Sequence, residues 1–114
     1  ASRCDFVENG RSALHALKAN VARFRLKGRT RIFRSDAFAF IDQIEDRPYD
    51  LCVADPPYTS ALAERVSRTW FDRPFSTVLA IEHDEAVHLP SPPRGVRRHR
   101  MRIDRSAVTL YRAS

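Results

Sequence analysis

The chain has 114 residues, 43% of them hydrophobic, which suits one globular domain with an apolar core. No apolar run approaches the roughly 20 residues of a membrane-spanning helix, and the N-terminus has no signal-peptide layout. Twenty Lys and Arg residues against 14 acids give a net charge of +6 and a pI near 10.1. Most of these cations are Arg, whose planar group pairs with phosphate and stacks on bases, so a nucleic-acid partner is favoured. A high-GC genome that encodes Arg freely is the alternative.

The first elements in chain order are a strand and a helix. Residues 3–8 predict a short strand that ends in Glu8, and Asn9-Gly10 breaks it. A helix follows, because apolar residues then recur at spacings of three and four and define one buried face. These residues are Leu14, Leu17, Val21 and Phe24. Gly28 is the expected C-terminal stop of this helix.

A second strand and a second helix come next. Ile32 and Phe33 indicate a strand over residues 29–34, and Ser35 or Asp36 can cap the helix after it. The apolar face of that helix is expected to contain Ala37, Phe40, Ile41 and Ile44. Residues 50–54 form a brief apolar run of the kind that is buried on both faces of a parallel sheet.

The remaining elements complete an alternating pattern. A third helix is predicted over residues 60–70, a strong strand over 76–82, an irregular proline-containing stretch, and a final pair of strands ending with 107–111. In this last strand Val108 and Leu110 share one face. Alternation of strands and helices predicts an α/β fold with a mostly parallel sheet and a C-terminal antiparallel hairpin. Residues 1–114 are expected to form a single domain, because no linker is long enough to split them.

The loop Asp55-Pro56-Pro57-Tyr58 carries the clearest chemistry. Asp55 directly follows a predicted parallel strand, and ligands bind outside the carboxyl ends of such strands. The two prolines remove backbone donors and stiffen a loop of free carbonyls. An exocyclic amine of a nucleobase is a poor nucleophile. A carboxylate and a carbonyl that accept hydrogen bonds from its two N–H groups would direct the nitrogen lone pair at a methyl donor. Tyr58 offers a flat face for an extruded base. The alternative is a plain strand-ending turn.

Two further acids follow predicted strands. Glu8 is well placed to accept hydrogen bonds from ribose hydroxyls, with Asn9 beside it, although a solvated carboxylate is the alternative. Asp36 could bind the amino group of an adenine while the Ala37 N–H contacts the ring, although an ordinary helix N-cap is the alternative. Because Glu8, Asp36 and Asp55 each end a successive strand, we expect them to line one crevice.

Other polar residues give weaker signals. Arg94, Arg97, Arg98 and Arg100 are predicted to contact an RNA backbone, and a solvated strand face is the alternative. The pair His83-Asp84 has no nucleophile nearby and is interpreted as structural, and no metal site is proposed. Both cysteines, Cys4 and Cys52, are interpreted as reduced core residues.

Taken in order, these segments resemble a known family. FVENGRSALHALKANVARF, DAF, DLCVADPPY, LAIEHD and AVTLYR are similar to the bacterial methyltransferases that modify the exocyclic N2 of a guanine in 16S ribosomal RNA. The resemblance implies a Rossmann-like methyltransferase fold and S-adenosylmethionine as the cofactor. It also implies 16S ribosomal RNA or a small-subunit assembly particle as the partner, and a cytoplasmic location. It further implies that Glu8 binds the ribose of the donor, that Asp36 and Ala37 bind its adenine, and that residues 55–58 bind the target base.

The chain departs from that family at its start. The family begins its catalytic domain with a strand and a glycine-rich loop, and the three glycines here form no such loop. Without that strand, the strands ending at Glu8 and Asp55 would each have an unpaired edge. We therefore expect a fragment of a longer protein; a chain whose missing element comes from elsewhere is the alternative. The alternatives are a DNA adenine-N6 methyltransferase, which shares the Asp-Pro-Pro-aromatic loop, and a non-catalytic RNA-binding remnant.

Overall fold

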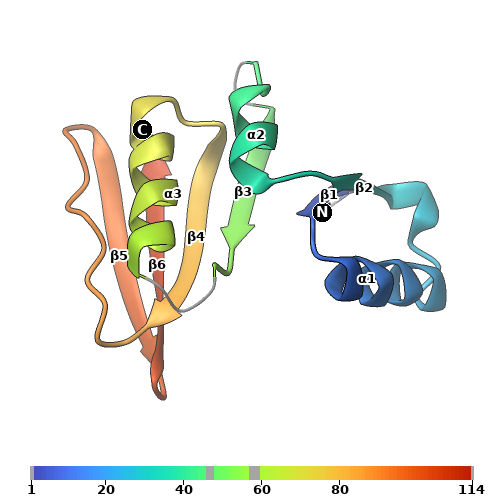
Figure 1. Ribbon diagram of the computed structural model, residues 1–114. Coiled ribbons are helices and arrows are strands. Elements are labelled where there is room, and N and C mark those ends of the chain that lie inside the picture. The colour runs from blue at the N-terminus through green and yellow to red at the C-terminus, as the bar shows by residue number, and fades with distance from the viewer. Residues whose placement is uncertain (1, 46–47, 57–59, 114) are drawn as a thin grey trace. The chain divides into compact units, whose positions relative to one another are not determined.

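The computed structural model describes residues 2–45, 48–56 and 60–113. It consists of two compact units, Ala1–Gln43 and Ile44–Ser114. Figure 1 shows the elements of both. Pro57 and Tyr58 of the predicted base-binding loop lie outside the described residues.

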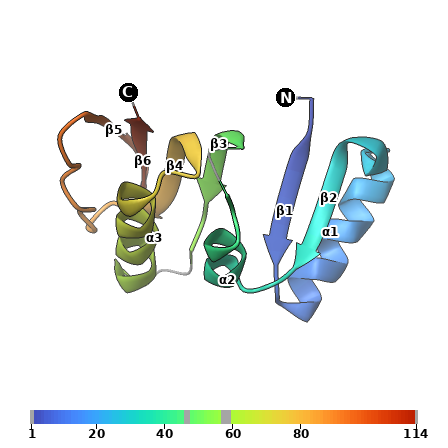
Figure 2. The ribbon, with the colours of Figure 1, turned by 90° about the horizontal axis from the view of Figure 1, so that it is seen from above.

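The first unit is a strand–helix–strand unit followed by a short helix. Its elements are β1 (Cys4–Glu8), α1 (Arg11–Arg23), the 3-10 turn η1 (Lys27–Arg29), β2 (Thr30–Arg34) and α2 (Ala37–Asp42). The strands β1 and β2 are parallel, with Cys4 opposite Thr30 and Glu8 opposite Arg34. Such a pair needs a crossover connection, which α1 provides by packing along the strands (Figure 2). The predicted order of elements is confirmed here.

The end of α1 differs from the prediction. The helix stops at Arg23, five residues before Gly28, and Gly28 lies inside η1. The Leu26 N–H donates to the Val21 carbonyl (2.9 Å) and the Arg25 N–H to the Ala22 carbonyl (3.1 Å), which is a Schellman motif. Arg25 occupies the left-handed position of this motif with φ 55°. Since the chain turns away there, Phe24 is 62% exposed and is not part of the core.

The second unit is a four-stranded mixed sheet with α3 on one face. Its elements are β3 (Tyr49–Ala54), α3 (Ser60–Asp72), β4 (Ser76–Asp84), β5 (Val96–Ile103) and β6 (Ser106–Ala113), and the strand order is β3-β4-β6-β5. β3 and β4 are parallel, whereas β6 is antiparallel to both β4 and β5. The expected parallel pairs and C-terminal antiparallel hairpin are therefore confirmed. Among the described residues β1 pairs only with β2, and β3 only with β4.

An aromatic core holds α3 against this sheet. Trp70 is fully buried, and its indole N–H donates to the Ser76 carbonyl and hydroxyl (both 3.1 Å). The Trp70 and Tyr111 rings stack with centroids 6.2 Å apart, and Phe71 meets Tyr111 edge-on at 4.9 Å. The Tyr111 hydroxyl donates to the Pro90 carbonyl (2.7 Å), so each buried polar tip of these rings has a partner.

The packing prediction for β3 is wrong. Leu51 and Val53 are 57% and 70% exposed, so β3 is not buried on both faces. In the described part of this unit α3 is the only helix, and it packs against β4, so one face of β3 has no helix to cover it. On β6, Val108 and Leu110 share one half-buried face, as expected, while Ala107, Thr109 and Tyr111 form the buried face. Ile44, expected on the second helix, lies beyond the end of α2.

Candidate active site

The turn after β1 fixes the carboxylate of Glu8. The backbone N–H groups of Asn9 and Gly10 both donate to Glu8 Oε1, at 3.2 and 2.9 Å. The side chain is half-buried at the carboxyl end of a parallel strand, immediately before the N-terminus of α1. Because both bonds use the same oxygen, Glu8 Oε2 remains able to accept bonds from a ligand. The turn thus holds the Glu8 carboxylate through one of its two oxygens.

Gly10 is needed in this turn for space. A Cβ built at Gly10 would lie 3.1 Å from Glu8 Oε1, which is closer than most real contacts. Its φ of −76° is open to any residue, so backbone freedom is not the reason for a glycine. From the sequence alone Gly10 indicates only the end of the strand. The missed signal is a glycine two residues after a strand-ending acid, where backbone amides can turn back to the carboxylate.

Asp36 lies at the end of β2, beside the end of β1. The Ser35 N–H donates to the Glu8 carbonyl (3.3 Å), which joins the two strand ends. Asp36 Oδ2 accepts from the Ala39 N–H (3.1 Å), so Asp36 is the N-cap of α2 and Ala37 is its first residue. The structure therefore shows the alternative interpretation of Asp36, an ordinary helix N-cap. It leaves Asp36 Oδ1 for a second partner, and the side chain is exposed.

Asp55 follows β3 in the second unit. Its side chain is exposed, and Pro56 after it is half-buried. Since β3 and β4 are parallel with Ala54 opposite Ile81, the end of β4 lies at the same edge of the sheet as Asp55. The expected crevice of Glu8, Asp36 and Asp55 joins residues of both units, and it stays a prediction. The roles of all residues at these strand ends likewise stay predictions.

His83, near the end of β4, has the structural surroundings expected of it. Its side chain is buried, with Nδ1 2.9 Å from the Asp84 carbonyl and Nε2 2.7 Å from the Thr109 hydroxyl. A carbonyl can only accept, so we assign the proton to Nδ1, and Nε2 then accepts from Thr109. The Asp84 carboxylate accepts from the Ala86 N–H (2.8 Å). Both side chains therefore hold the turn after β4.

The arginines of β5 divide into two groups. Successive strand residues alternate between faces, and one face directs Arg98, Arg100 and Arg102 toward the segment after β4. Arg98 and Arg100 donate to the Leu89 and Val87 carbonyls (3.5 and 3.4 Å), and Arg102 pairs with Glu85 (2.6 Å). Arg97 lies on the opposite face, and Arg94 is in the turn before the strand; both are exposed. Of the four predicted RNA contacts, Arg94 and Arg97 are thus the better placed.

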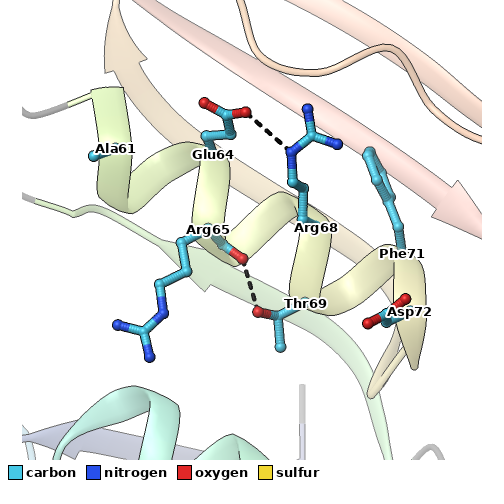
Figure 3. A pocket seen from close by; sticks show the side chains of 7 residues that line it. All are labelled: Ala61, Glu64, Arg65, Arg68, Thr69, Phe71 and Asp72. Atoms are coloured by element: carbon cyan, nitrogen blue, oxygen red, sulfur yellow. Dashed lines mark hydrogen bonds and ion pairs between the residues drawn. The ribbon is translucent and has the colours of Figure 1, made fainter.

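A surface hollow lies along the outward side of α3. It is lined by Ala61, Glu64, Arg65, Arg68, Thr69, Phe71 and Asp72 (Figure 3). Arg68 pairs with Glu64 (3.0 Å), and the Thr69 hydroxyl donates to the Arg65 carbonyl (2.7 Å). Opposite charges alternate here, and all of the lining comes from one helix. We assign the hollow no part in the chemistry.

The two cysteines have different surroundings, and neither is disulfide-bonded. Burial raises the pKa of the Cys52 thiol to about 11. Cys4 is exposed, contrary to the expected core position. Partial burial and the neighbouring Asp5 carboxylate raise the pKa of its thiol as well. Both groups are therefore protonated at neutral pH, so neither is a ready nucleophile.

Over residues 2–45, 48–56 and 60–113 no cluster of three or more His, Cys, Asp or Glu side chains could hold a metal ion. No helix in these same ranges has the length and apolar character to cross a membrane.

Parallel strands connected by helices, with acidic residues at the strand ends, are typical of a Rossmann-like fold. The class of fold is that of the class I methyltransferases. Residues 1–112 match the family described as Conserved hypothetical protein 95, and the chain belongs to that family. Family and fold together support the coarser functional expectation, a methyltransferase that uses S-adenosylmethionine. No protein of curated function matches the chain.

Several solved structures share the fold. A conserved hypothetical protein from Streptococcus pyogenes is 23% identical with a TM-score of 0.83, over 99% of this chain and 72% of that one. A protein from Escherichia coli described as "Putative methyltransferase yhhF" is 22% identical with a TM-score of 0.82, over 100% and 65%. The N-terminal domain of human METTL16 in complex with SAH is 12% identical with a TM-score of 0.70, over 96% and 51%. The chain thus spans about two thirds of the length of its bacterial relatives.

Proposed function

We propose that this chain is the greater part of an S-adenosylmethionine-dependent methyltransferase that modifies the exocyclic N2 amine of a guanine in 16S ribosomal RNA. The observation that carries the proposal is the Glu8 turn. A carboxylate there is held by two backbone N–H bonds to one oxygen, and the second oxygen remains for a ligand. This arrangement at the carboxyl end of a parallel strand suits the two hydroxyls of a ribose.

The residues of the first unit fit the donor. In the proposed complex Glu8 Oε2 accepts from the ribose, with the Asn9 backbone next to it, and Asp36 Oδ1 accepts from the adenine amino group while the Ala37 N–H faces the ring. The SAH bound to METTL16 supports this choice, because SAH is the product that remains when S-adenosylmethionine has given its methyl group. When bound, the donor supplies an electrophilic methyl group on a positively charged sulfur.

Asp55 is the proposed partner of the target amine. An exposed carboxylate that directly follows a parallel strand can accept a hydrogen bond from one N–H of the amine, and the carbonyl of Pro56 can accept one from the other. These bonds would keep the nitrogen lone pair directed at the methyl group. Pro57 and Tyr58 are assigned from the sequence to the same task, the first as a stiff loop residue and the second as a stacking face.

Charge supports RNA as the substrate class. Most of the cations behind the net charge of +6 are Arg, and Arg94 before β5 and Arg97 in β5 are exposed. The specific base, the small-subunit particle and the cytoplasmic location come from the family resemblance and are part of the proposal.

The proposal is tested by product analysis. The full-length protein is incubated with S-adenosylmethionine carrying a labelled methyl group and, in parallel, with unmethylated small-subunit particles, free 16S RNA and duplex DNA. We expect label in N2-methylguanosine on digestion of the RNA. Label in N6-methyladenine of the DNA would replace the proposal with the alternative enzyme. Donor and RNA binding without any transfer would replace it with a non-catalytic RNA-binding protein.

A further inference from the structure

The connection between α1 and β2 is strongly basic and contains an exposed aromatic ring. We define it as the 23–29 segment, with the sequence RFRLKGR. It has four cations, Arg23, Arg25, Lys27 and Arg29, and no acid. Among the described residues none of these four forms an ion pair. A concentration of positive charge without internal neutralisation is suited to a polyanion.

Phe24 is the aromatic residue of this segment. Its side chain is 62% exposed, and the Arg23 guanidinium carbon lies 5.7 Å from the ring centroid. A phenyl ring with one face supported by a cation can stack a base on its other face. The ring belongs to no core, because the Schellman motif turns the chain away from the helix at this residue. An exposed ring between cations is the pattern of a single-strand binding surface.

Arg25 adds an observation about the backbone. It has φ 55° at a position where glycine is the usual residue, because only glycine avoids contact between Cβ and the backbone there. A long cationic side chain at a strained position lowers stability. A role in binding would explain why an arginine occupies this position, directly after Phe24 in the sequence.

The segment is separate from the proposed donor site. It precedes the amino end of β2, whereas Glu8 and Asp36 lie at the carboxyl ends of β1 and β2. The five residues of β2 span about 16 Å, so one donor molecule does not need to contact both ends.

We propose that the 23–29 segment binds single-stranded RNA, with an unpaired base stacked on Phe24 and phosphates held by Arg25, Lys27 and Arg29. This inference rests on the proposed function in one respect, namely that RNA is the substrate class. An acidic protein surface would use the same cations, but it would gain little from a flat ring without neighbouring apolar residues. Within the 23–29 segment the other large apolar side chain is Leu26, which is 37% exposed.

The test measures RNA binding independently of methyl transfer. Fluorescence anisotropy is recorded for the full-length protein with a labelled single-stranded 12-nucleotide RNA, with the same RNA as a duplex, and with an acidic peptide. Phe24→Ala should weaken single-strand binding by roughly 5- to 150-fold, whereas Phe24→Trp should retain it. Lys18→Ala, which removes an exposed cation of α1, is the matched control. Equal loss for Phe24→Trp, equal affinity for duplex, or tighter binding of the peptide would each overturn the proposal.

Arg25→Gly separates binding from folding. Glycine relieves the left-handed strain, so this variant should melt about 2–6 °C higher than wild type. It should also bind the RNA less tightly, and the slope of log affinity against log salt should fall by about 0.7 for the lost phosphate contact. A more stable protein with weaker binding cannot be explained by misfolding. Unchanged affinity and slope would contradict the role of Arg25. Since methyl transfer and donor affinity are measured separately, failure here leaves the proposed function testable by its own experiment.

Discussion

The two units of the chain differ in how they are stabilised. Apolar residues that are buried in the first unit are Leu14, Val21 and Ile41, whereas the second unit contains a continuous core around Trp70 and Tyr111. The first unit also depends on a polar contact, the pair of bonds between Arg31 and Asp5 (2.9 and 2.8 Å). Two-stranded sheets are marginal alone. We infer that the donor-side residues lie on the less stable unit and the target-side Asp55 on the more stable one.

The largest expected effect on stability is in the second unit. Trp70→Ala removes a fully buried ring and its bonds to Ser76, and it should lower the free energy of unfolding by about 3–5 kcal/mol. Urea denaturation measures this loss. Phe24→Ala, which removes an exposed ring, is the control and should change stability by less than about 1 kcal/mol. If both variants lose a similar amount of unfolding free energy, the burial of Trp70 does not explain the stability of the second unit.

A smaller effect is expected for the ion pair of the first unit. Arg31→Ala leaves the Asp5 carboxylate, whose side chain is 7% exposed, without its bidentate partner. The Arg31 side chain is 56% exposed, so solvent screens the pair and the expected loss is about 1–2 kcal/mol. Arg34→Ala on the same strand is the control. Hydrogen exchange should show the loss in β1 and β2 but not in β4, and equal changes in β4 would show that the effect of this ion pair is not confined to the first unit.

The space at Gly10 gives a prediction for donor affinity. Gly10→Ala should displace the Glu8 carboxylate by a few tenths of an ångström and lower the affinity for S-adenosylmethionine by about 3- to 10-fold. Gly28→Ala is the matched control, because a Cβ at Gly28 meets no atom within 4 Å. Calorimetry measures both variants. If they bind the donor equally well, the Glu8 turn does not hold the ribose.

A further expected effect is a pH dependence in the second unit, which is confined to alkaline pH. Burial raises the pKa of Cys52 from 9.0 to about 11, so the neutral thiol is favoured in the folded state. The stability that comes from burying the neutral Cys52 thiol is fully present below pH 9 and is lost as the pH rises to 11. Cys52→Ala should therefore lose less stability than wild type across this window, measured by urea unfolding. If the free energy of unfolding falls equally with pH in both proteins, burial does not raise the pKa of the Cys52 thiol.

Much of this fold could be predicted from the sequence. The apolar patterns predicted the order of elements, and Glu8, Asp36 and Asp55 lie at or just after the ends of parallel strands, as expected. Their roles and their common crevice stay predictions. The ends of elements were harder. Gly28 was expected to end α1, but hydrogen bonds from Arg25 and Leu26 close the helix earlier, and a glycine rule does not anticipate an arginine in a left-handed position.

Contacts between distant parts of the chain could not be predicted from the sequence. The arginines of β5 formed one basic cluster in the sequence, but Arg98 and Arg100 donate to carbonyls of the segment after β4. The apolar run of β3 predicted burial on both faces, and the exposure of Val53 depends on which elements cover the sheet. Local patterns carry neither kind of information, since both depend on contacts between distant parts of the chain.

The central claim is that donor and target are recognised by different strand ends, one in each unit. Its most direct test compares Glu8→Ala and Asp55→Ala in the full-length protein, with donor affinity and single-turnover methyl transfer to 16S RNA measured on the same preparations. Asp50→Ala, at the opposite end of β3, is the control. We predict that Glu8→Ala loses donor affinity, and that Asp55→Ala keeps it while transfer slows by about 100-fold or more. Transfer at the wild-type rate by Asp55→Ala, or donor affinity lost equally in both variants, would contradict the account.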